Sequence, residues 1–341
     1  MTMTRRTLLA GTAGLLATTR LASAQDATAD WSRVEAAAKQ EGTLEIYSAF
    51  TAQDTLKAVI AAFEKKHGLT VNLLSARGSE IRERLRAAQA SGRFLADVMF
   101  TSYAQSEIIM NEDKGIVPPP SIPSAGKIRA DVRTTAPIIP VITIPYGILI
   151  NTGLVKPEDE PKSWADLADP KWKGKILLDD PRAIGGGYLW FYVLHDKLGR
   201  DYVEKMAAQM PTFTQGPIEA HRRIARGEFP IYIPLSLPEY TNLKGLPVKA
   251  IFPTEGSMYV PYGNTFITKA PHPNAARLYM EFCLSEEAQL IFGNNGFAVA
   301  NADVIGKVPD AVKPIVGAKL LGTVEAARQD QMAAIAKQIF K

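Results

Sequence analysis

The chain has 341 residues, of which 46% are hydrophobic and 22% are charged. This composition supplies a sizeable core and excludes intrinsic disorder. The first 24 residues hold three arginines and no acidic residue, so the other 317 carry 36 basic and 35 acidic side chains. Such neutrality excludes the basic excess of a nucleic-acid-binding protein, and 317 residues exceed one ordinary domain.

The first 24 residues have the pattern of an export signal. Arg5 and Arg6 precede an apolar run over residues 8–17, and an Ala-Ser-Ala sequence at residues 22–24 forms a small-residue cleavage site. The run is shorter than the roughly 20 residues that span a bilayer. The arginine pair favours the twin-arginine route, although paired arginines also occur in ordinary signals. We therefore expect a periplasmic protein, cleaved after Ala24.

Helices and strands alternate over the next part of the chain. Apolar periodicity predicts helices at residues 31–41, 56–63 and 79–90, and strands at residues 44–48, 70–74 and 97–101. Gly42, Gly68 and Gly92 follow the three helices, where a glycine commonly ends one. Strands that alternate with helices predict a mostly parallel α/β sheet.

A proline-rich connector divides this block from a second one. Seven prolines between residues 118 and 145 exclude regular helix, and residues 146–151 read as a strand that carries the chain between lobes. The second block predicts strands at 175–178 and 229–234 and helices at 188–198, 202–209 and 218–226, followed by a strand at 265–268 and a helix at 274–282.

These two blocks predict an α/β fold of two lobes with a ligand cleft between them. Residues 25–143 and 262–310 form lobe 1, residues 144–261 form lobe 2, and helices in residues 311–341 pack on lobe 2. Because ligands bind outside the carboxyl ends of strands in open α/β sheets, the loops at residues 48–51, 76–80 and 101–103 are candidates. A fourth is the turn at 180–188, where three consecutive glycines allow close backbone approach.

Several segments resemble the family 1 extracellular solute-binding proteins of ABC importers, in their ferric-binding-protein-like branch. The matching segments are residues 164–175 (WADLADPKWKGK), 270–276 (APHPNAA) and 285–289 (SEEAQ), with family-like strands at residues 44–49 and 96–101. The resemblance covers essentially the whole mature chain. It implies a type II periplasmic-binding-protein fold with two hinged lobes, and an ABC permease as the membrane partner.

The resemblance also bears on the ligand. The best-known members of the branch bind ferric iron through paired tyrosines after a turn like the one at residues 225–228, but Leu237 and Pro238 stand at that place. The family histidine also lacks a counterpart, and Glu80 alone falls near the family's glutamate. One carboxylate and scattered tyrosines make a poor site for a hard cation, so we expect no metal site and no cofactor.

We instead expect a small anionic solute that bears a phosphate, phosphonate or carboxylate group. Hydroxyl groups, backbone N–H groups and two arginines would hold its charge, and aromatic side chains would enclose the organic part. The candidate ligand-binding residues are Ser48, Phe50, Arg77, Ser79, Glu80, Thr101, Ser102, Tyr103, Arg182, Gly185, Gly186, Gly187, Tyr188, Gln215, Ser236, Tyr240 and Tyr262. Arg77 has an alternative role as an ion-pair partner of Glu80, and each tyrosine has one in core packing.

Enzymatic function finds no support in the motifs. The four histidines are scattered without metal-ligand spacing, and no nucleophile elbow, P-loop or dinucleotide-binding loop occurs. Cys283, the one cysteine, lies in a helical apolar pattern and is expected to be buried. We expect a monomeric binding protein that contacts no nucleic acid, with a ferric-binding protein and a secreted enzyme of unrecognised type as the alternatives.

Overall fold

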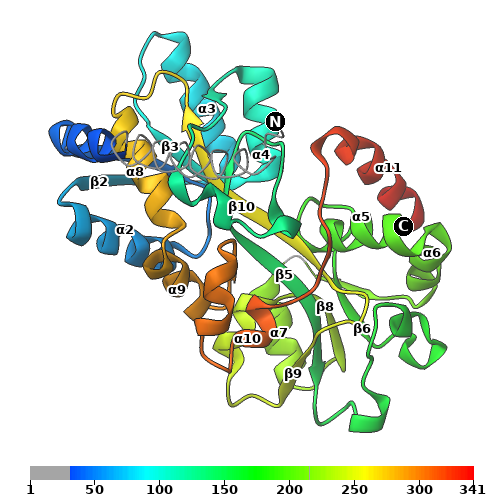
Figure 1. The fold of residues 1–341 in the computed structure, drawn as a ribbon. Helices are drawn as coiled ribbons and strands as arrows, with labels where there is room; N and C mark the ends of the chain where they lie inside the picture. The colour runs from blue at the N-terminus through cyan, green and yellow to red at the C-terminus, as the bar shows by residue number, and fades with distance from the viewer. Residues whose placement is uncertain (1–30, 215) are drawn as a thin grey trace, which may run out of the picture.

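Two long strands, β5 (Ile139–Asn151) and β10 (Ser257–Ile267), cross the middle of the molecule and connect its two lobes (Figure 1). The computed structural model describes residues 31–214 and 216–341. The first part of β5 pairs with β10 in antiparallel fashion, and its second part pairs with strands of lobe 2. The main path of the sheet runs β2-β1-β3-β10-β5-β8-β6-β7, so both lobes are built on strands joined through this pair.

Lobe 1 is built on three parallel strands, β1 (Thr43–Ser48), β2 (Thr70–Ser75) and β3 (Val98–Ser102). Helix α2 (Gln53–His67) buries Leu56, Val59, Ile60 and Phe63, the face that the apolar spacing predicts. The other helices of this lobe are a helix at residues 31–41, α3 (Gly78–Ala90), α4 (Tyr103–Ile108), α8 (Pro273–Cys283) and α9 (Glu286–Asn294). Helix α2 ends at Gly68, whose φ of 72° is left-handed.

Lobe 2 repeats the α/β plan with β6 (Ile176–Asp179), β7 (Thr212–Thr214), β8 (Ile231–Ser236) and β9 (Val248–Ile251). Strand β6 lies parallel to both β7 and β8. Its helices are α5 (Gly186–Leu198), α6 (Arg200–Ala208) and α7 (Pro217–Ala225), with a 3-10 helix η7 (Leu237–Leu243) directly after β8. Helix α5 is buried along most of its length, including Trp190, Phe191 and Leu194.

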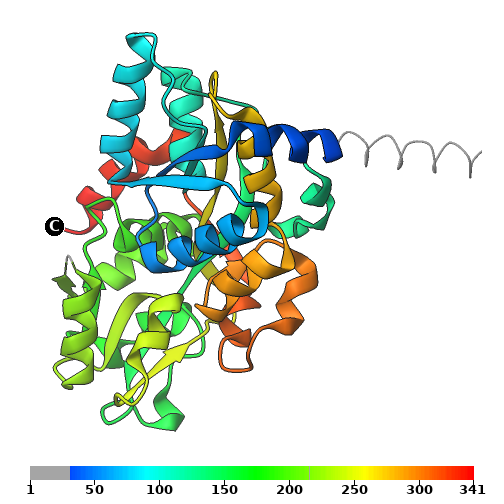
Figure 2. The same ribbon diagram turned by 90° about the vertical axis from the view of Figure 1, so that its left-hand side faces the viewer.

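The chain ends on lobe 2. After β11 (Ala298–Val299), α10 (Lys313–Val316) and β12 (Leu320–Gly322), helix α11 (Gln329–Ile339) lies beside α5 and α6 (Figures 1 and 2). Met332, Ala336 and Phe340 are buried in the core that also holds Trp190 and Phe191. By contrast, Val312 and Val316 lie in the lobe 1 core. None of the described helices is long and apolar enough to cross a membrane.

The proline-rich connector contains more strand than the sequence predicts. Its last seven residues, 139–145, belong to β5, which begins at Ile139 and passes through Pro140 and Pro145. Residues Thr143 and Ile144 between these prolines pair with Pro261 and Val260 of β10. Pairing with a neighbouring strand therefore outweighs the loss of two backbone donors, which local sequence cannot reveal.

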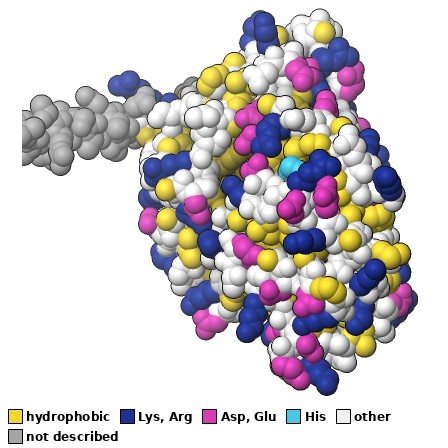
Figure 3. Space-filling model, turned by 90° about the vertical axis from the view of Figure 1, so that its right-hand side faces the viewer, with side chains coloured by type: hydrophobic (Ala, Val, Ile, Leu, Met, Phe, Trp, Pro, Cys, Tyr) yellow, Lys and Arg dark blue, Asp and Glu magenta, His cyan; other side chains and the backbone are white. Residues whose placement is uncertain are grey.

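Two further predictions concern burial and surface charge. Cys283 is a free, buried thiol, as its helical pattern predicts, and burial raises its pKa to about 12. On the face of the molecule shown in Figure 3, basic and acidic side chains are interspersed. Such a surface agrees with the near-neutral composition.

Candidate ligand-binding cleft

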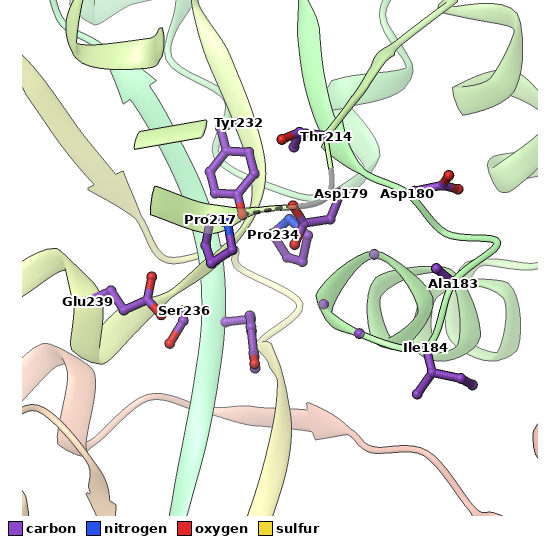
Figure 4. Close-up of a pocket in the computed structure, with 14 residues that line it drawn as sticks. Asp179, Asp180, Ala183, Ile184, Thr214, Pro217, Tyr232, Pro234, Ser236 and Glu239 are labelled. Carbon is purple, nitrogen blue, oxygen red and sulfur yellow. Dashed lines mark hydrogen bonds between the residues drawn. The ribbon is translucent and has the colours of Figure 1, made fainter. Parts of the chain in front are cut away.

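The carboxyl ends of β6, β7 and β8 meet in lobe 2 and place Asp179, Thr214 and Ser236 around one cavity. We call this cavity of about 390 Å³ the lobe 2 cavity (Figure 4). Its lining is Tyr146, Asp179, Asp180, Ala183, Ile184, Gly185, Gly186, Gly187, Thr214, Pro217, Tyr232, Pro234, Ser236 and Glu239. Three of these side chains are carboxylates, and no lysine or arginine is among these described residues.

A second cavity, of about 350 Å³, lies between the two lobes, and we call it the interlobe cavity. Lobe 1 contributes Ser102, Tyr103 and Gln105, while lobe 2 contributes Tyr188 and Leu189. The remaining lining residues are Ala104, Ile108, Tyr146, Ile184, Gly185, Gly186, Val260, Pro261, Thr323, Val324 and Gln329. Its described lining residues carry hydroxyl and amide groups but no charged side chain.

The two cavities adjoin each other. They share Tyr146 on the crossing strand β5 and Ile184, Gly185 and Gly186 at the start of helix α5. A solute that fills both would therefore touch lobe 1, lobe 2 and the strands that join them. This is the contact pattern by which a ligand holds two hinged lobes together.

The three glycines at residues 185–187 have different structural roles. A Cβ atom on Gly187 would lie 2.1 Å from the carbonyl oxygen of Asp179, and one on Gly186 would lie 2.8 Å from the Asp179 carboxylate. Gly185 faces open space, with no atom within 4 Å of such a Cβ. Two of the glycines therefore let helix α5 start directly against the end of β6, which fixes Asp179 at the wall of the cavity.

Asp179 is a carboxylate without a basic partner. Its Oδ1 accepts a hydrogen bond from Tyr232 Oη at 3.1 Å, the interaction drawn in Figure 4. Burial raises the pKa of Asp179 to about 7; the nearby Glu239 acts in the same direction, and the hydrogen bond from Tyr232 opposes it. A substantial fraction of Asp179 is therefore protonated at neutral pH.

Glu239 stands on helix η7 and also lacks a cationic partner. Its closest basic group is the ring of His221, whose Nε2 lies 3.5 Å from Glu239 Oε2. Burial lowers the pKa of His221 to about 4, so the imidazole is neutral at physiological pH. Burial also raises the pKa of Glu239. His221 is 7% exposed, and its Nε2 makes no hydrogen bond within the described part of the chain.

Arg182 forms an ion pair with Asp180. Its Nε and Nη2 atoms each donate to the carboxylate of Asp180 at 2.8 Å, and its guanidinium lies 4.6 Å from the ring centre of Phe213. This ion pair lowers the pKa of Asp180. In Figure 4, the Asp180 side chain points away from Asp179 and Tyr232. The one arginine of the glycine turn therefore neutralises Asp180 and leaves Asp179 and Glu239 unpaired.

The structure brings together part of the predicted site. The predicted residues that line the two cavities are Ser102, Tyr103, Gly185, Gly186, Gly187, Tyr188 and Ser236. Three of them already have a protein partner: Ser102 Oγ accepts from Gln105 N at 3.5 Å, Tyr103 Oη donates to Val132 O at 3.0 Å, and Tyr188 Oη donates to Gln329 O at 2.8 Å.

The other predicted residues do not line these cavities. Arg77, Ser79 and Glu80 are exposed at the start of α3. Phe50 is buried against Phe100 and Tyr262 in the lobe 1 core. The remaining six are Ser48, whose Oγ accepts from Phe50 N, Thr101, which is buried in β3, Tyr240, which packs on the lobe 2 core, Tyr262, which packs on the lobe 1 core, Arg182, which pairs with Asp180, and Gln215, which lies outside the described residues.

The polar residues of the lobe 2 cavity that sequence reasoning missed include Tyr146, Asp179, Tyr232 and Glu239. For Asp179 a signal was present, because it is the last residue of a strand and stands shortly before the glycine turn. The other three give no such signal. Their approach depends on the pairing of β5 with β8, where Tyr146 lies opposite Ser236.

Comparison with known proteins identifies the family. Residues 44–298 match the model of the family described as bacterial extracellular solute-binding protein. The chain belongs to this family. Among curated relatives, a putative 2-aminoethylphosphonate-binding periplasmic protein of Salmonella typhimurium is 27% identical over 254 residues, which cover 67% of this chain and 68% of the relative.

Two other curated relatives match shorter stretches. An uncharacterized protein of Haemophilus influenzae is 28% identical over 145 residues, and iron uptake protein A1 of Synechocystis is 28% identical over 136 residues. The matches span 42% and 34% of these relatives and 41% and 37% of this chain. Both matches therefore cover less than half of each protein.

The fold is similar to that of several solved structures. The Trichodesmium protein IdiA (FutA), in complex with iron and citrate, has a TM-score of 0.73 at 23% identity, with 87% of this chain and 99% of that chain covered. Iron-bound HitA from Pseudomonas aeruginosa has a TM-score of 0.69 at 18% identity, with the same coverage. These structures confirm the type II periplasmic-binding-protein fold, and the family match confirms the resemblance to extracellular solute-binding proteins.

Proposed function

We propose that this protein is the periplasmic substrate-binding component of an ABC importer and captures a small organic solute that carries a phosphate, phosphonate or carboxylate group. The observation that carries the proposal is the interlobe cavity, which both lobes line with hydroxyl and amide groups and without a carboxylate. The relative named as a putative 2-aminoethylphosphonate-binding protein supports an anionic group on the solute. The closed complex would then be delivered to a membrane permease.

Binding and lobe closure test this function directly. Because a ligand that binds only the folded state stabilises it, a cognate solute raises the melting temperature in proportion to the logarithm of its concentration. We expect this shift with at least one small phosphonate, phosphate ester or carboxylate, and a smaller radius of gyration in solution scattering of the same sample. A panel that produces neither change contradicts the proposal.

Ferric iron is a second candidate ligand. One relative is named an iron uptake protein, and Asp179, Glu239, Tyr146 and Tyr232 surround the lobe 2 cavity with carboxylate and phenol oxygens. However, Tyr232 Oη donates to Asp179, and burial raises the pKa of Tyr232 well above 10, so the phenol keeps its proton. Among the described residues, no group of three or more His, Cys, Asp or Glu side chains is placed to hold a metal ion.

Visible absorption distinguishes the two candidate ligands. Ferric ion bound by a tyrosine phenolate absorbs visible light, whereas a complex with a colourless organic anion does not. We expect no visible band after addition of ferric citrate. A saturable band that disappears in Tyr232→Phe or Tyr146→Phe would assign iron as the ligand.

The proposed function requires that the protein be exported to the periplasm. The leader at residues 1–24 lies outside the described residues, and its pattern supports translocation by the twin-arginine route. The mature protein is expected to begin at Gln25 and to act as a monomer. N-terminal sequencing of periplasmic protein checks the cleavage site, and replacement of Arg5 and Arg6 by lysine checks the route, since the ordinary secretory route accepts lysine in place of arginine.

A further inference from the structure

The lobe 2 cavity has a charge that does not suit an anion. Two of its three carboxylates, Asp179 and Glu239, have no lysine or arginine within ion-pair distance in the described structure, while Asp180 is neutralised by Arg182. An anionic group placed beside Asp179 and Glu239 would meet like charge in a partly dehydrated site whenever either carboxyl is ionised. The anionic part of a solute therefore belongs in the uncharged interlobe cavity.

We infer that the lobe 2 cavity binds an ammonium group of the solute, with Asp179 and Glu239 as its counter-ions, so that the solute is a zwitterion. This inference rests on the proposed function and names the class of its substrate. A charged group in a partly buried site is stable only when it is paired or hydrogen-bonded. The ammonium group of the ligand would supply the positive charge that the described protein side chains do not.

The geometry of the cavity suits an ammonium group. A primary ammonium has three donors and no acceptor. Asp179 Oδ1 already accepts from Tyr232, which leaves Oδ2 to receive a donor, and Glu239 provides a second carboxylate. Ser236 lines the same wall, and in Figure 4 its hydroxyl lies on the same side of the cavity as Glu239. Acceptors from β6, β8 and η7 thus converge on one cavity.

A second observation concerns the surroundings of Glu239. His221 is buried and directs Nε2 toward Glu239, yet it makes no hydrogen bond in the described structure. The ring packs edge-on against Tyr232, with 5.6 Å between ring centres. Together with Glu239, His221 lines a separate groove rather than the lobe 2 cavity. Arg222 and Arg226 line the same groove, but neither forms an ion pair with Glu239 in the described structure. Glu239 thus has no cationic partner among the described side chains and remains available to a donor bound in the lobe 2 cavity.

The two adjoining cavities explain how one solute carries both charges. Tyr146, Gly185 and Gly186 line both cavities, so a short chain passing these residues would join an ammonium group in lobe 2 to an anionic group between the lobes. Lobe closure would then depend on both ends of the solute. A solute with only one charged end would satisfy only one cavity.

Matched probe pairs test the inference by calorimetry on the mature protein. The pairs are 2-aminoethylphosphonate with ethylphosphonate, and β-alanine with propionate, which differ only in the amine. We expect the amino member of at least one pair to bind about tenfold more tightly or better, the gain typical of a charge-assisted hydrogen bond. Equal affinity within both pairs overturns the inference and leaves the proposed function standing.

Isosteric variants assign the effect to the cavity. Asp179→Asn and Glu239→Gln are each expected to lower the affinity for the amino probe about tenfold and to leave that for its partner unchanged. Glu219→Gln, an exposed carboxylate on α7 outside the cavity, is the control with no expected effect. Because the Glu239 side chain is partly exposed, we expect Glu239→Gln to fold even if Asp179→Asn does not. Amino-probe affinity that survives in both variants contradicts the assignment.

Two further probes separate the remaining outcomes. Binding of 1,4-diaminobutane without any phosphonate or carboxylate binding would support the ammonium site and reject the anionic part of the proposed function. Ferric citrate that binds with a visible band, in competition with the amino probe, would overturn the inference in favour of a metal. Failure of every phosphonate, carboxylate and amine probe would reject both the ammonium site and the proposed ligand class.

Discussion

The two walls of the cleft differ in chemistry, although each wall lies at the end of a parallel α/β sheet. On the lobe 1 side, Ser102 accepts a hydrogen bond from Gln105 N, and Tyr103 donates one to Val132 O. No charged side chain lines the interlobe cavity within the described residues. On the lobe 2 side, Asp179 and Glu239 stand without a cationic partner. The shared architecture therefore brings polar groups to the cleft, but neighbouring loops decide which of them remain available to a ligand.

The largest effect is expected from Gly187→Ala, which breaks the lobe 2 wall alone. The added Cβ would lie 2.1 Å from the Asp179 carbonyl oxygen, which is backbone and cannot rotate away. We expect a loss of about 3 kcal/mol in the free energy of unfolding, measured by chemical denaturation. Gly185→Ala is the matched control, because its Cβ faces open space. Equal stability of the two variants would show that α5 does not start as tightly against β6 as described.

The second-largest effect is expected in the pH dependence of the free energy of unfolding, to which the carboxyl groups of the lobe 2 wall contribute. The pKa of Asp179 is about 7 in the fold and 3.8 ordinarily, so the folded protein binds more protons between these values. Its contribution to the free energy of unfolding therefore falls as pH rises through this window, on the order of 2 kcal/mol. Glu239 acts in the same direction, whereas the lowered pKa of His221 gives the opposite sign.

The difference between the wild type and Asp179→Asn isolates this contribution. Of the other groups that face Asp179, Tyr232 stays protonated throughout and Asp180 stays paired with Arg182. Denaturation at about pH 4.5 and about pH 7.5 should show the wild type losing stability relative to the variant as pH rises. Parallel pH profiles for the two proteins would mean that Asp179 ionises normally in the fold.

A smaller effect is expected from Tyr232→Phe. The variant removes the hydrogen bond to Asp179 Oδ1 and keeps the ring that packs on His221. We expect a loss of about 1 kcal/mol in the free energy of unfolding. The pKa of Asp179 should rise further, since this hydrogen bond is the interaction that lowers it. Titration of the Asp179 carboxyl by NMR measures the pKa, and a lower value in the variant would contradict the described contact.

The smallest effect is expected from Arg182→Ala. The guanidinium is committed to Asp180 and stacked on Phe213, and the pair is partly exposed. We expect less than about 1 kcal/mol of lost stability and less than about a threefold change in affinity for an anionic probe. A tenfold loss of that affinity, measured by calorimetry, would instead support the direct ligand contact that the sequence predicts.

Local patterns in the sequence predict most of the elements. The faces of α2 and α3, the glycines that end helices and the parallel strands of lobe 1 follow from periodicity and backbone preference, which act within a few residues. Strand β5 departs from this rule, because Pro140 and Pro145 disfavour a strand that its pairing with β10 enforces. The candidate site is predicted in part for the same reason: the glycine turn is a local signal, while Tyr146 and Glu239 are not.

By itself, the sequence determines an α/β chain with polar loops at strand ends, a glycine turn in the second block and family-like segments that indicate a solute-binding protein. Those features depend on residues that are neighbours along the chain. Tertiary structure decides which charges remain free. Arg182 finds Asp180 two residues away, whereas Asp179, Tyr232 and Glu239 come from three elements and meet only when β6, β8 and η7 assemble. Because electrostatic interaction depends on distance and burial, the character of the cleft follows from the fold.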